Sequence, residues 1–232
     1  MSQNSDSYNR IVEQWHEYRS KTAPDSCVID FASRIKPGGK ILDVGCGTGV
    51  PLARYLAQRG FLVTGIDVSG KMIAKARELN LANAEFHHRD FFDFQPAWTY
   101  DGVLAFDSFF HIPLKRQREI YPRLSSWMNP GAWLLFTHGY TEGRRKGVMF
   151  GQPFSYSALD VGEVRQALRD NGFHIEASIE DYQDPTTGQR DLLILAEKVE
   201  EVTGRERAAR TLVGILPSSV DYQALREERI LS

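Results

Sequence analysis

Cysteine is scarce in this sequence of 232 residues, which contains only Cys27 and Cys46. The two cysteines follow no metal-ligand spacing, and the six histidines are scattered along the chain. The sequence therefore predicts neither a disulfide framework nor a zinc site, and we expect no bound metal. A low cysteine content also fits a protein of the reducing cytoplasm.

Long apolar runs and a large excess of one charge are missing as well. The N-terminal stretch MSQNSDSYNR has no apolar signal core, and no window approaches the roughly 18 apolar residues that a membrane span needs. The formal net charge is only -2, which gives no reason to expect attraction to nucleic acid or to an anionic membrane. We expect a cytoplasmic protein whose partners are small molecules.

What the sequence does contain is a regular alternation of strand-like and helical patterns. Amphipathic patterns at residues 8–19 and 25–35 predict two N-terminal helices. Short apolar runs then alternate with helical periodicity, with predicted strands at 40–44, 61–66, 84–88, 100–106 and 132–138 and predicted helices at 51–60, 70–79 and 114–128. Such alternation is typical of a doubly wound α/β fold, a parallel sheet with both faces covered.

The pattern changes towards the C-terminal end. Residues 139–157 read as a long loop, and Asp160 as the N-cap of a helix. Two further strand-like runs flank DPTTGQ, a connection so short that the strands must be antiparallel. We predict one Rossmann-like domain over residues 1–199, with a seven-stranded, mostly parallel sheet and an antiparallel last strand. Residues 200–232, where charge density rises, are predicted to be a short helical tail of unknown role.

The most informative stretch is ILDVGCGTG at Ile41–Gly49, where glycines occupy alternate positions. Glycine loses more backbone entropy on folding than any other residue. We therefore expect Gly45, Gly47 and Gly49 to let a ligand approach the backbone, and not to serve packing. Their spacing is GxGxG, whereas the dinucleotide fingerprint GxGxxG would place its third small residue where Val50 stands.

Acidic residues stand at the ends of four successive predicted strands, at Asp43, Asp67, Asp90 and Asp107. Because the carboxyl ends of parallel strands meet at one sheet edge, these acids form one constellation. Asp67 has the place of an acid that binds ribose hydroxyls. Asp90 is followed by Phe91 and Phe92, a grouping that can accept a hydrogen bond from an adenine amino group and cover its ring.

In combination, ILDVGCGTG, GIDVSGKMIAKAR, HHRDFFDF, YDGVLAFDSFFHI and NPGAWLLFTHG resemble the class I S-adenosylmethionine-dependent methyltransferases over about residues 8–199. The resemblance implies S-adenosylmethionine as cofactor, with its methionine part in the glycine turn, its ribose on Asp67, its adenine at Met72, Phe91 and Asp90, and its amino group near Asp107. It also implies an N-terminal lid over the cofactor. The cofactor-binding residues expected on this basis are Asp43, Gly45, Cys46, Gly47, Thr48, Gly49, Asp67, Val68, Met72, Asp90, Phe91, Phe92 and Asp107, with Tyr8, Trp15 and Arg19 from the lid.

The acceptor side has fewer signals. His111 follows the fourth predicted strand, where it can act as a general base during methyl transfer or simply bond to backbone. His138, Tyr140 and Phe150 are the further candidates for acceptor binding, and we interpret loop 139–157 as a lid on that side. Arg144, Arg145 and Lys146 within it are interpreted as a solvated turn and not as an anion clamp.

The predicted function is methyl transfer from S-adenosylmethionine to a small molecule. FDSF stands after the fourth strand in place of an NPPY-type tetrad, which argues against a nucleic-acid acceptor. One alternative is an NAD-dependent oxidoreductase on a similar fold. The other is a non-catalytic module that binds S-adenosylmethionine and uses residues 200–232 to bind a protein partner.

Overall fold

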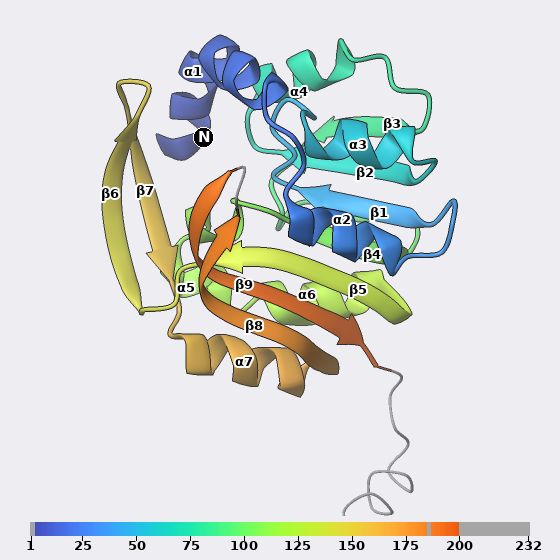
Figure 1. Ribbon diagram of the computed structural model, residues 1–232. Helices are drawn as coiled ribbons and strands as arrows, with labels where there is room; N and C mark the ends of the chain where they lie inside the picture. The colour runs from blue at the N-terminus through green and yellow to red at the C-terminus, as the bar shows by residue number, and fades with distance from the viewer. Residues whose placement is uncertain (1–2, 185–186, 200–232) are drawn as a thin grey trace, which may run out of the picture. The chain divides into compact units, whose positions relative to one another are not determined.

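The computed structural model describes residues 3–184 and 187–199. Its main feature is a seven-stranded sheet in the order β3-β2-β1-β4-β5-β9-β8 (Figure 1). The strands are β1 (Lys40–Val44), β2 (Leu62–Asp67), β3 (Ala84–His88), β4 (Tyr100–Ala105), β5 (Met128–His138), β8 (Phe173–Asp184) and β9 (Gly188–Lys198). Neighbours from β3 to β5 are parallel, and β9 runs antiparallel to both β5 and β8. The predicted mostly parallel sheet with an antiparallel last strand is confirmed.

Helices cover both faces of this sheet, because each face carries its own buried apolar cluster. On one face α2 (Ser26–Ser33), α3 (Leu52–Gln58) and α4 (Gly70–Arg77) pack against the strands, and on the other α6 (Ile120–Trp127) and α7 (Val161–Asp170) do so. Asp160 caps α7 as predicted, since its carboxylate accepts a hydrogen bond from the Gly162 amide at 2.8 Å. The two clusters fix the sheet and leave its carboxyl edge open for a site.

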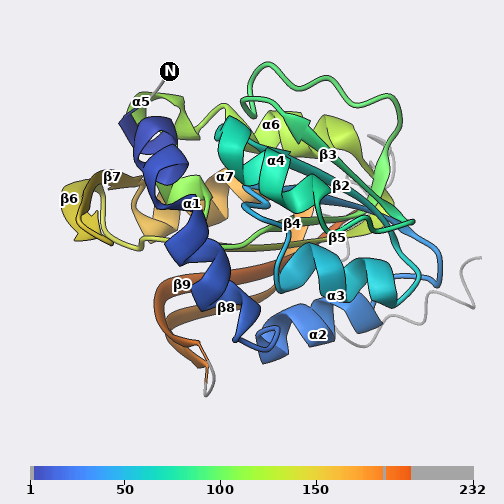
Figure 2. The same cartoon turned by 90° about the horizontal axis from the view of Figure 1, so that it is seen from above.

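Helix α1 (Gln3–Ser20) and a separate hairpin stand over that edge. The hairpin pairs β6 (Gly143–Met149) with β7 (Gln152–Ala158), and Figure 2 shows α1 crossing between it and α4. Asn4 ties α1 to the hairpin, because its side chain donates to the Ser155 carbonyl and accepts from the Ser155 amide at 2.8 and 2.9 Å. The N-terminal helix is therefore fastened to the body of the domain at its first turn.

The hairpin corrects the prediction of a long loop over residues 139–157. Its two-residue turn consists of Phe150 and Gly151, whose φ angles are +49° and +74°. Two left-handed residues are the mark of a type I′ turn, in which Asn-Gly or Asp-Gly is usual. Phenylalanine is rare in that conformation, so the sequence signal for the hairpin was hidden.

The predicted single helix over residues 114–128 is also wrong. The chain forms α5 (Leu114–Gln117) and then α6, and β5 begins at Met128, four residues before the predicted strand. Pro122 explains the break, because a proline inside a continuous helix would remove a hydrogen bond and clash with the preceding turn. In α6 it lies in the first turn, where its missing N–H is harmless.

The predictions about the C-terminal end fall on residues that the structure does not describe. The predicted tail at 200–232 lies outside the described residues, so the domain boundary at residue 199 stays a prediction. Within the described ranges, no helix is long and apolar enough to cross a membrane.

Candidate active site

The glycine turn follows β1 at the open sheet edge. Gly45 and Gly47 have φ angles of +76° and +54°, a left-handed region that favours glycine. A Cβ atom on Gly45 would lie 2.4 Å from the Ser108 Cβ, and one on Gly47 would lie 3.3 Å from the Trp15 indole nitrogen. Both positions therefore need glycine, and both bring the backbone close to side chains around a cavity.

Gly49 corrects the expectation that none of the glycines serves packing. A Cβ atom there would lie 2.9 Å from Leu79 and 3.2 Å from Phe86, so this glycine lets β3 and the segment that follows α4 approach the turn. Its neighbour Thr48 is fully buried and its hydroxyl has no hydrogen-bond partner in the described part of the chain. Neither residue lines the cavity described next.

A first cavity of about 260 Å³ lies at the carboxyl edge of β1, β2 and β4, beneath α1. It brings together most of the predicted cofactor residues from distant parts of the sequence. The predicted residues that line it are Tyr8, Trp15, Arg19, Asp43, Gly45, Cys46, Gly47, Asp67, Val68, Asp90, Phe91, Phe92, Asp107 and His111. The predicted convergence of four strand-end acids on one site is therefore seen in the structure.

Two of these acids, Asp43 and Asp67, lie beside the glycine turn. Asp67 accepts hydrogen bonds from the amides of Gly47 at 3.0 Å and Ser69 at 2.7 Å, one on each carboxylate oxygen. Burial raises the pKa of Asp67. Burial, helped by the charge of Asp67, raises the pKa of Asp43 to about 7. The wall at this point is thus a pair of carboxyl groups that a cation or a hydroxyl donor would stabilise.

The aromatic wall lies at the end of β3. The Asp90 carboxylate accepts a hydrogen bond from the Phe92 amide at 2.8 Å, and the Arg116 guanidinium lies 3.5 Å from the centre of the Phe92 ring. Phe91 is buried. Met72, in contrast, is fully buried and lies in a cluster with Ile11 and Phe154, so it does not line the cavity.

Asp107 lies two residues after the end of β4 and has a strained backbone conformation, with a φ angle of +55°. Its carboxylate accepts two hydrogen bonds from the Arg190 guanidinium, at 3.1 and 2.9 Å, and its amide donates to the Thr137 hydroxyl at 2.8 Å. Arg190 belongs to β9 and was not predicted, because no local pattern signals a bidentate pair between residues 83 positions apart.

His111 lies in a short 3₁₀ turn, η1 (Phe109–His111), and both of its ring nitrogens are occupied. Nε2 lies 2.9 Å from the Tyr8 hydroxyl, and Nδ1 lies 2.9 Å from the Asn4 amide nitrogen and 3.2 Å from the Ser155 carbonyl. Burial lowers the pKa of His111 to about 4 and raises that of Tyr8. A neutral imidazole bonded to Tyr8 is therefore the resting arrangement.

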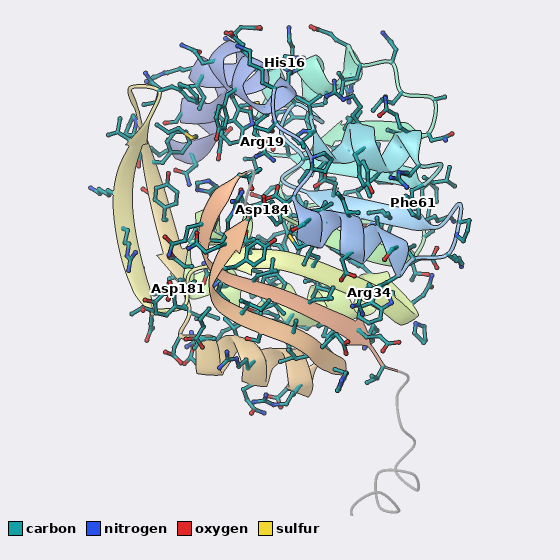
Figure 3. All side chains as sticks on the ribbon, in the orientation of Figure 1. His16, Arg19, Arg34, Phe61, Asp181 and Asp184 are labelled. Carbon is teal, nitrogen blue, oxygen red and sulfur yellow. The ribbon has the colours of Figure 1, made fainter. Side chains whose placement is uncertain are left out.

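A second cavity of about 710 Å³ adjoins the first, between α1, the end of β5, the hairpin and β9. Trp15, Arg19 and Asp107 line both cavities and form the wall between them. Arg19, labelled in Figure 3, is only 7% exposed. In residues 3–184 and 187–199 its guanidinium makes no ion pair or hydrogen bond, and it lies 5.8 Å from the centre of the Trp15 ring. An unpaired buried cation at such a junction is a ready partner for an anion.

Two of the predicted acceptor residues, His138 and Phe150, line the second cavity. His138 is buried, its Nδ1 donates to the Gly139 carbonyl at 2.6 Å, and burial lowers its pKa. Tyr140 packs against the core cluster and does not line this cavity, and His111 lines the first cavity only.

Comparison with known proteins gives consistent matches. Residues 41–131 match the family model described as a methyltransferase domain. The chain is 33% identical over 158 residues to phosphoethanolamine N-methyltransferase 3 of Arabidopsis thaliana, and 30% identical over 149 residues to the magnesium-protoporphyrin O-methyltransferase of a Synechocystis strain. These alignments cover 65% and 60% of this chain, but only 31% and 64% of the two relatives.

Solved structures agree on the fold. The DhpI complex with S-adenosylhomocysteine superposes with a TM-score of 0.66 at 22% identity, covering 86% of this chain and 97% of that one. CalS10, an amino pentose methyltransferase from Micromonospora echinaspora with S-adenosylmethionine bound, gives 0.62 at 22% identity, covering 80% and 96%. Residues 41–131 thus match a methyltransferase domain, and the chain shares the fold of solved S-adenosylmethionine-dependent methyltransferases.

Proposed function

We propose that the protein transfers a methyl group from S-adenosylmethionine in the first cavity to a small molecule in the second. The observation that carries the proposal is the shared wall of Trp15, Arg19 and Asp107, at which two cavities of unequal size meet at the carboxyl edge of the sheet. In open α/β folds that edge is where ligands bind. A donor and an acceptor held on either side of this wall would have their reacting atoms close together.

The first cavity has groups that suit each part of this cofactor. The buried carboxyl group of Asp43 and the half-buried one of Asp67 face a region where ribose hydroxyls or positive charge would be stabilised. The unpaired guanidinium of Arg19 suits the carboxylate of the methionine end. Phe91 and Phe92, with Asp90 beside them, suit a flat ring that carries an amino group.

When bound, the cofactor would supply a methyl group on a positively charged sulfur: an acceptor atom bonds to the methyl carbon in line, and the sulfur leaves as a neutral thioether. The contribution of the protein is then orientation and the exclusion of water, for which α1 and the hairpin close the site from above. Asp107, fixed by Arg190 and Thr137, holds its carboxylate at the junction. His111 stays the proposed base. It would take the proton of the acceptor either directly, after its Nε2 releases the Tyr8 hydroxyl, or by way of that hydroxyl.

A small acceptor is supported by the size of the second cavity and by the curated relatives, whose names give phosphoethanolamine and magnesium protoporphyrin as their substrates. The test is formation of S-adenosylhomocysteine, followed by mass spectrometry, with a panel of hydroxyl, amine and thiol acceptors. We expect at least one acceptor to gain a single methyl group. Tight binding of S-adenosylmethionine without turnover on any acceptor would favour a non-catalytic binding module instead.

The binding-module alternative also has a direct test in the region outside the described residues. Deleting residues 200–232 should leave both cofactor affinity and turnover unchanged if the methyltransferase domain is complete at residue 199. Loss of a protein complex on the same deletion, with turnover intact, would assign the tail a second role. The oxidoreductase alternative is less well supported, since the GxGxG spacing and the methyltransferase domain match both oppose it.

A further inference from the structure

The hydrogen bonds of Asn4 fix the orientation of its side-chain amide. Asn4 is buried, with only 6% of its surface exposed. Its Oδ1 accepts a hydrogen bond from the Ser155 backbone amide at 2.9 Å, and its Nδ2 donates to the Ser155 carbonyl at 2.8 Å. A backbone N–H only donates and a carbonyl only accepts, so the oxygen and the nitrogen of this side chain cannot be exchanged.

The same Nδ2 atom of Asn4 also lies 2.9 Å from Nδ1 of His111. An amide nitrogen is a donor only, so a hydrogen bond at this distance requires that Nδ1 accept it and carry no proton. Burial lowers the pKa of His111 to about 4, so the imidazole is neutral at neutral pH. In a neutral imidazole whose Nδ1 accepts, the proton belongs to Nε2.

The opposite tautomer of His111 has a poorer set of partners. Among the described residues, a proton on Nδ1 would have the Ser155 carbonyl as its acceptor, at 3.2 Å, and that carbonyl already accepts from Asn4. The second N–H of the buried Asn4 amide would then face another N–H and lose its acceptor. An unpaired buried donor is costly enough to shift such an equilibrium about tenfold or more.

The tautomer of His111 decides the direction of the Tyr8 hydroxyl. With its proton on Nε2, His111 donates to the Tyr8 oxygen, 2.9 Å away. The hydrogen of that hydroxyl then points elsewhere, and it has no other acceptor in the part of the chain that the structure describes. Asn4, Tyr8 and His111 all line the first cavity. The Tyr8 O–H is therefore available to an acceptor atom of a ligand there.

We propose that Asn4 is a positioning residue, which holds His111 in the tautomer with its proton on Nε2 and so makes the Tyr8 hydroxyl a donor to the bound ligand. The consequence for catalysis rests on the proposed function, in which His111 is the base. Nε2 can accept a proton only in the other tautomer, which requires the Asn4 amide to turn away. The placement of α1, which carries Asn4, thus controls whether His111 can act as a base.

The test is the ¹⁵N spectrum of the imidazole rings in the full chain, at neutral pH and without ligand. Two-bond couplings to the ring hydrogens distinguish a protonated nitrogen from an unprotonated one. His138 is an internal control, because its Nδ1 donates to the Gly139 carbonyl at 2.6 Å. We expect the proton on Nε2 in His111 and on Nδ1 in His138, with the signals assigned from His111→Gln and His138→Gln.

Two variants identify the cause of the preference. Asn4→Ala removes the donor to Nδ1, so the ratio of the His111 tautomers should shift about tenfold or more toward the form that donates to the Ser155 carbonyl. Tyr8→Phe keeps Asn4 and should leave the proton on Nε2. An unchanged His138 signal shows that each variant is folded.

A proton on Nδ1 of His111 in the wild type would overturn the inference. So would an unaltered ratio of tautomers in folded Asn4→Ala, or a shift to Nδ1 in Tyr8→Phe. Because these spectra need no cofactor, the outcome is separate from a failure of the proposed function, which would show as no formation of S-adenosylhomocysteine with any acceptor.

Discussion

The charged side chains of this site are shielded from water, so the stability of each charge depends on the groups that contact it directly. Asp67 has both carboxylate oxygens bonded to backbone amides, and Asp107 has both bonded to one guanidinium. The Arg19 guanidinium makes no hydrogen bond or ion pair among the described residues and contacts only the Trp15 ring, at 5.8 Å from its centre. A buried charge without a partner is unfavourable until a ligand supplies one. Of these three residues, Arg19 is therefore the one most available to an anionic group of a ligand.

Asp67→Ala should weaken binding of S-adenosylmethionine by about 1 to 3 kcal/mol, through loss of hydrogen bonds from the ribose hydroxyls and loss of the anchor for the Gly47 amide. Titration calorimetry measures the effect. Asp93→Ala is a matched control, since Asp93 is an exposed acid that lines neither cavity. Unchanged affinity in Asp67→Ala would refute the assignment.

His111 and Tyr8 are best separated by a pair of variants. If His111 is the base, His111→Ala should lower kcat by about 10²-fold or more while cofactor affinity stays close to that of the wild type. Tyr8→Phe keeps the ring and removes only the hydroxyl bonded to Nε2, so turnover should persist if His111 takes the proton directly. Wild-type turnover in His111→Ala would reduce this histidine to a structural role.

Asp43 gives a prediction for pH. The pKa of Asp43 in the folded protein is raised to about 7 by burial and by the charge of Asp67. Because the folded state then holds the proton more tightly than the unfolded state, this residue makes stability fall as pH rises from about 4 to about 7. Asp43→Asn should remove that contribution.

The measurement is Tm of both proteins without ligand across this pH range. We expect Tm of the wild type, relative to Asp43→Asn, to decline steadily between about pH 4 and pH 7, and to level off above it. A difference in Tm that is constant with pH would contradict the assignment of a raised pKa to this carboxyl group.

At the scale of helices and strands, α1 is fixed by contacts with residues far away in the sequence. Asn4 in its first turn bonds to Ser155, 151 positions further along the chain. Asn4 makes three hydrogen bonds, two to the backbone of Ser155 and one to His111. Asn4→Ala should therefore loosen the contact between α1 and the hairpin, with a loss of about 1 to 3 kcal/mol. Hydrogen exchange in α1 should quicken, and cofactor affinity should fall because Tyr8, Trp15 and Arg19 belong to this helix.

Most of the sheet and the glycine turn could be predicted from sequence, because strand periodicity and turn chemistry are local. The hairpin could not, since its turn puts Phe150 in a conformation that phenylalanine seldom adopts. The break between α5 and α6 had a signal in Pro122 that a periodic pattern obscured. The same contrast holds in the site, where Asp67 follows from its motif, but the Arg190–Asp107 pair and the burial of Met72 depend on tertiary packing.

In the molecule as a whole, two cavities lined by different kinds of side chain lie at the carboxyl edge of the sheet. The first has carboxyl groups and rings from β1, β2 and β3. The second has cations and rings from α1, the hairpin and β9. The wall of Trp15, Arg19 and Asp107 belongs to both, and the proposed reaction requires both to be filled at once.

The most direct measurement is isothermal titration of the full chain with S-adenosylmethionine, S-adenosylhomocysteine and NAD in parallel, with Asp67→Ala as the control. We predict micromolar binding of the first two, weakened in the variant, and none of NAD. Binding of NAD alone, or equal binding of all three that is insensitive to Asp67, would contradict the assignment of the first cavity to S-adenosylmethionine.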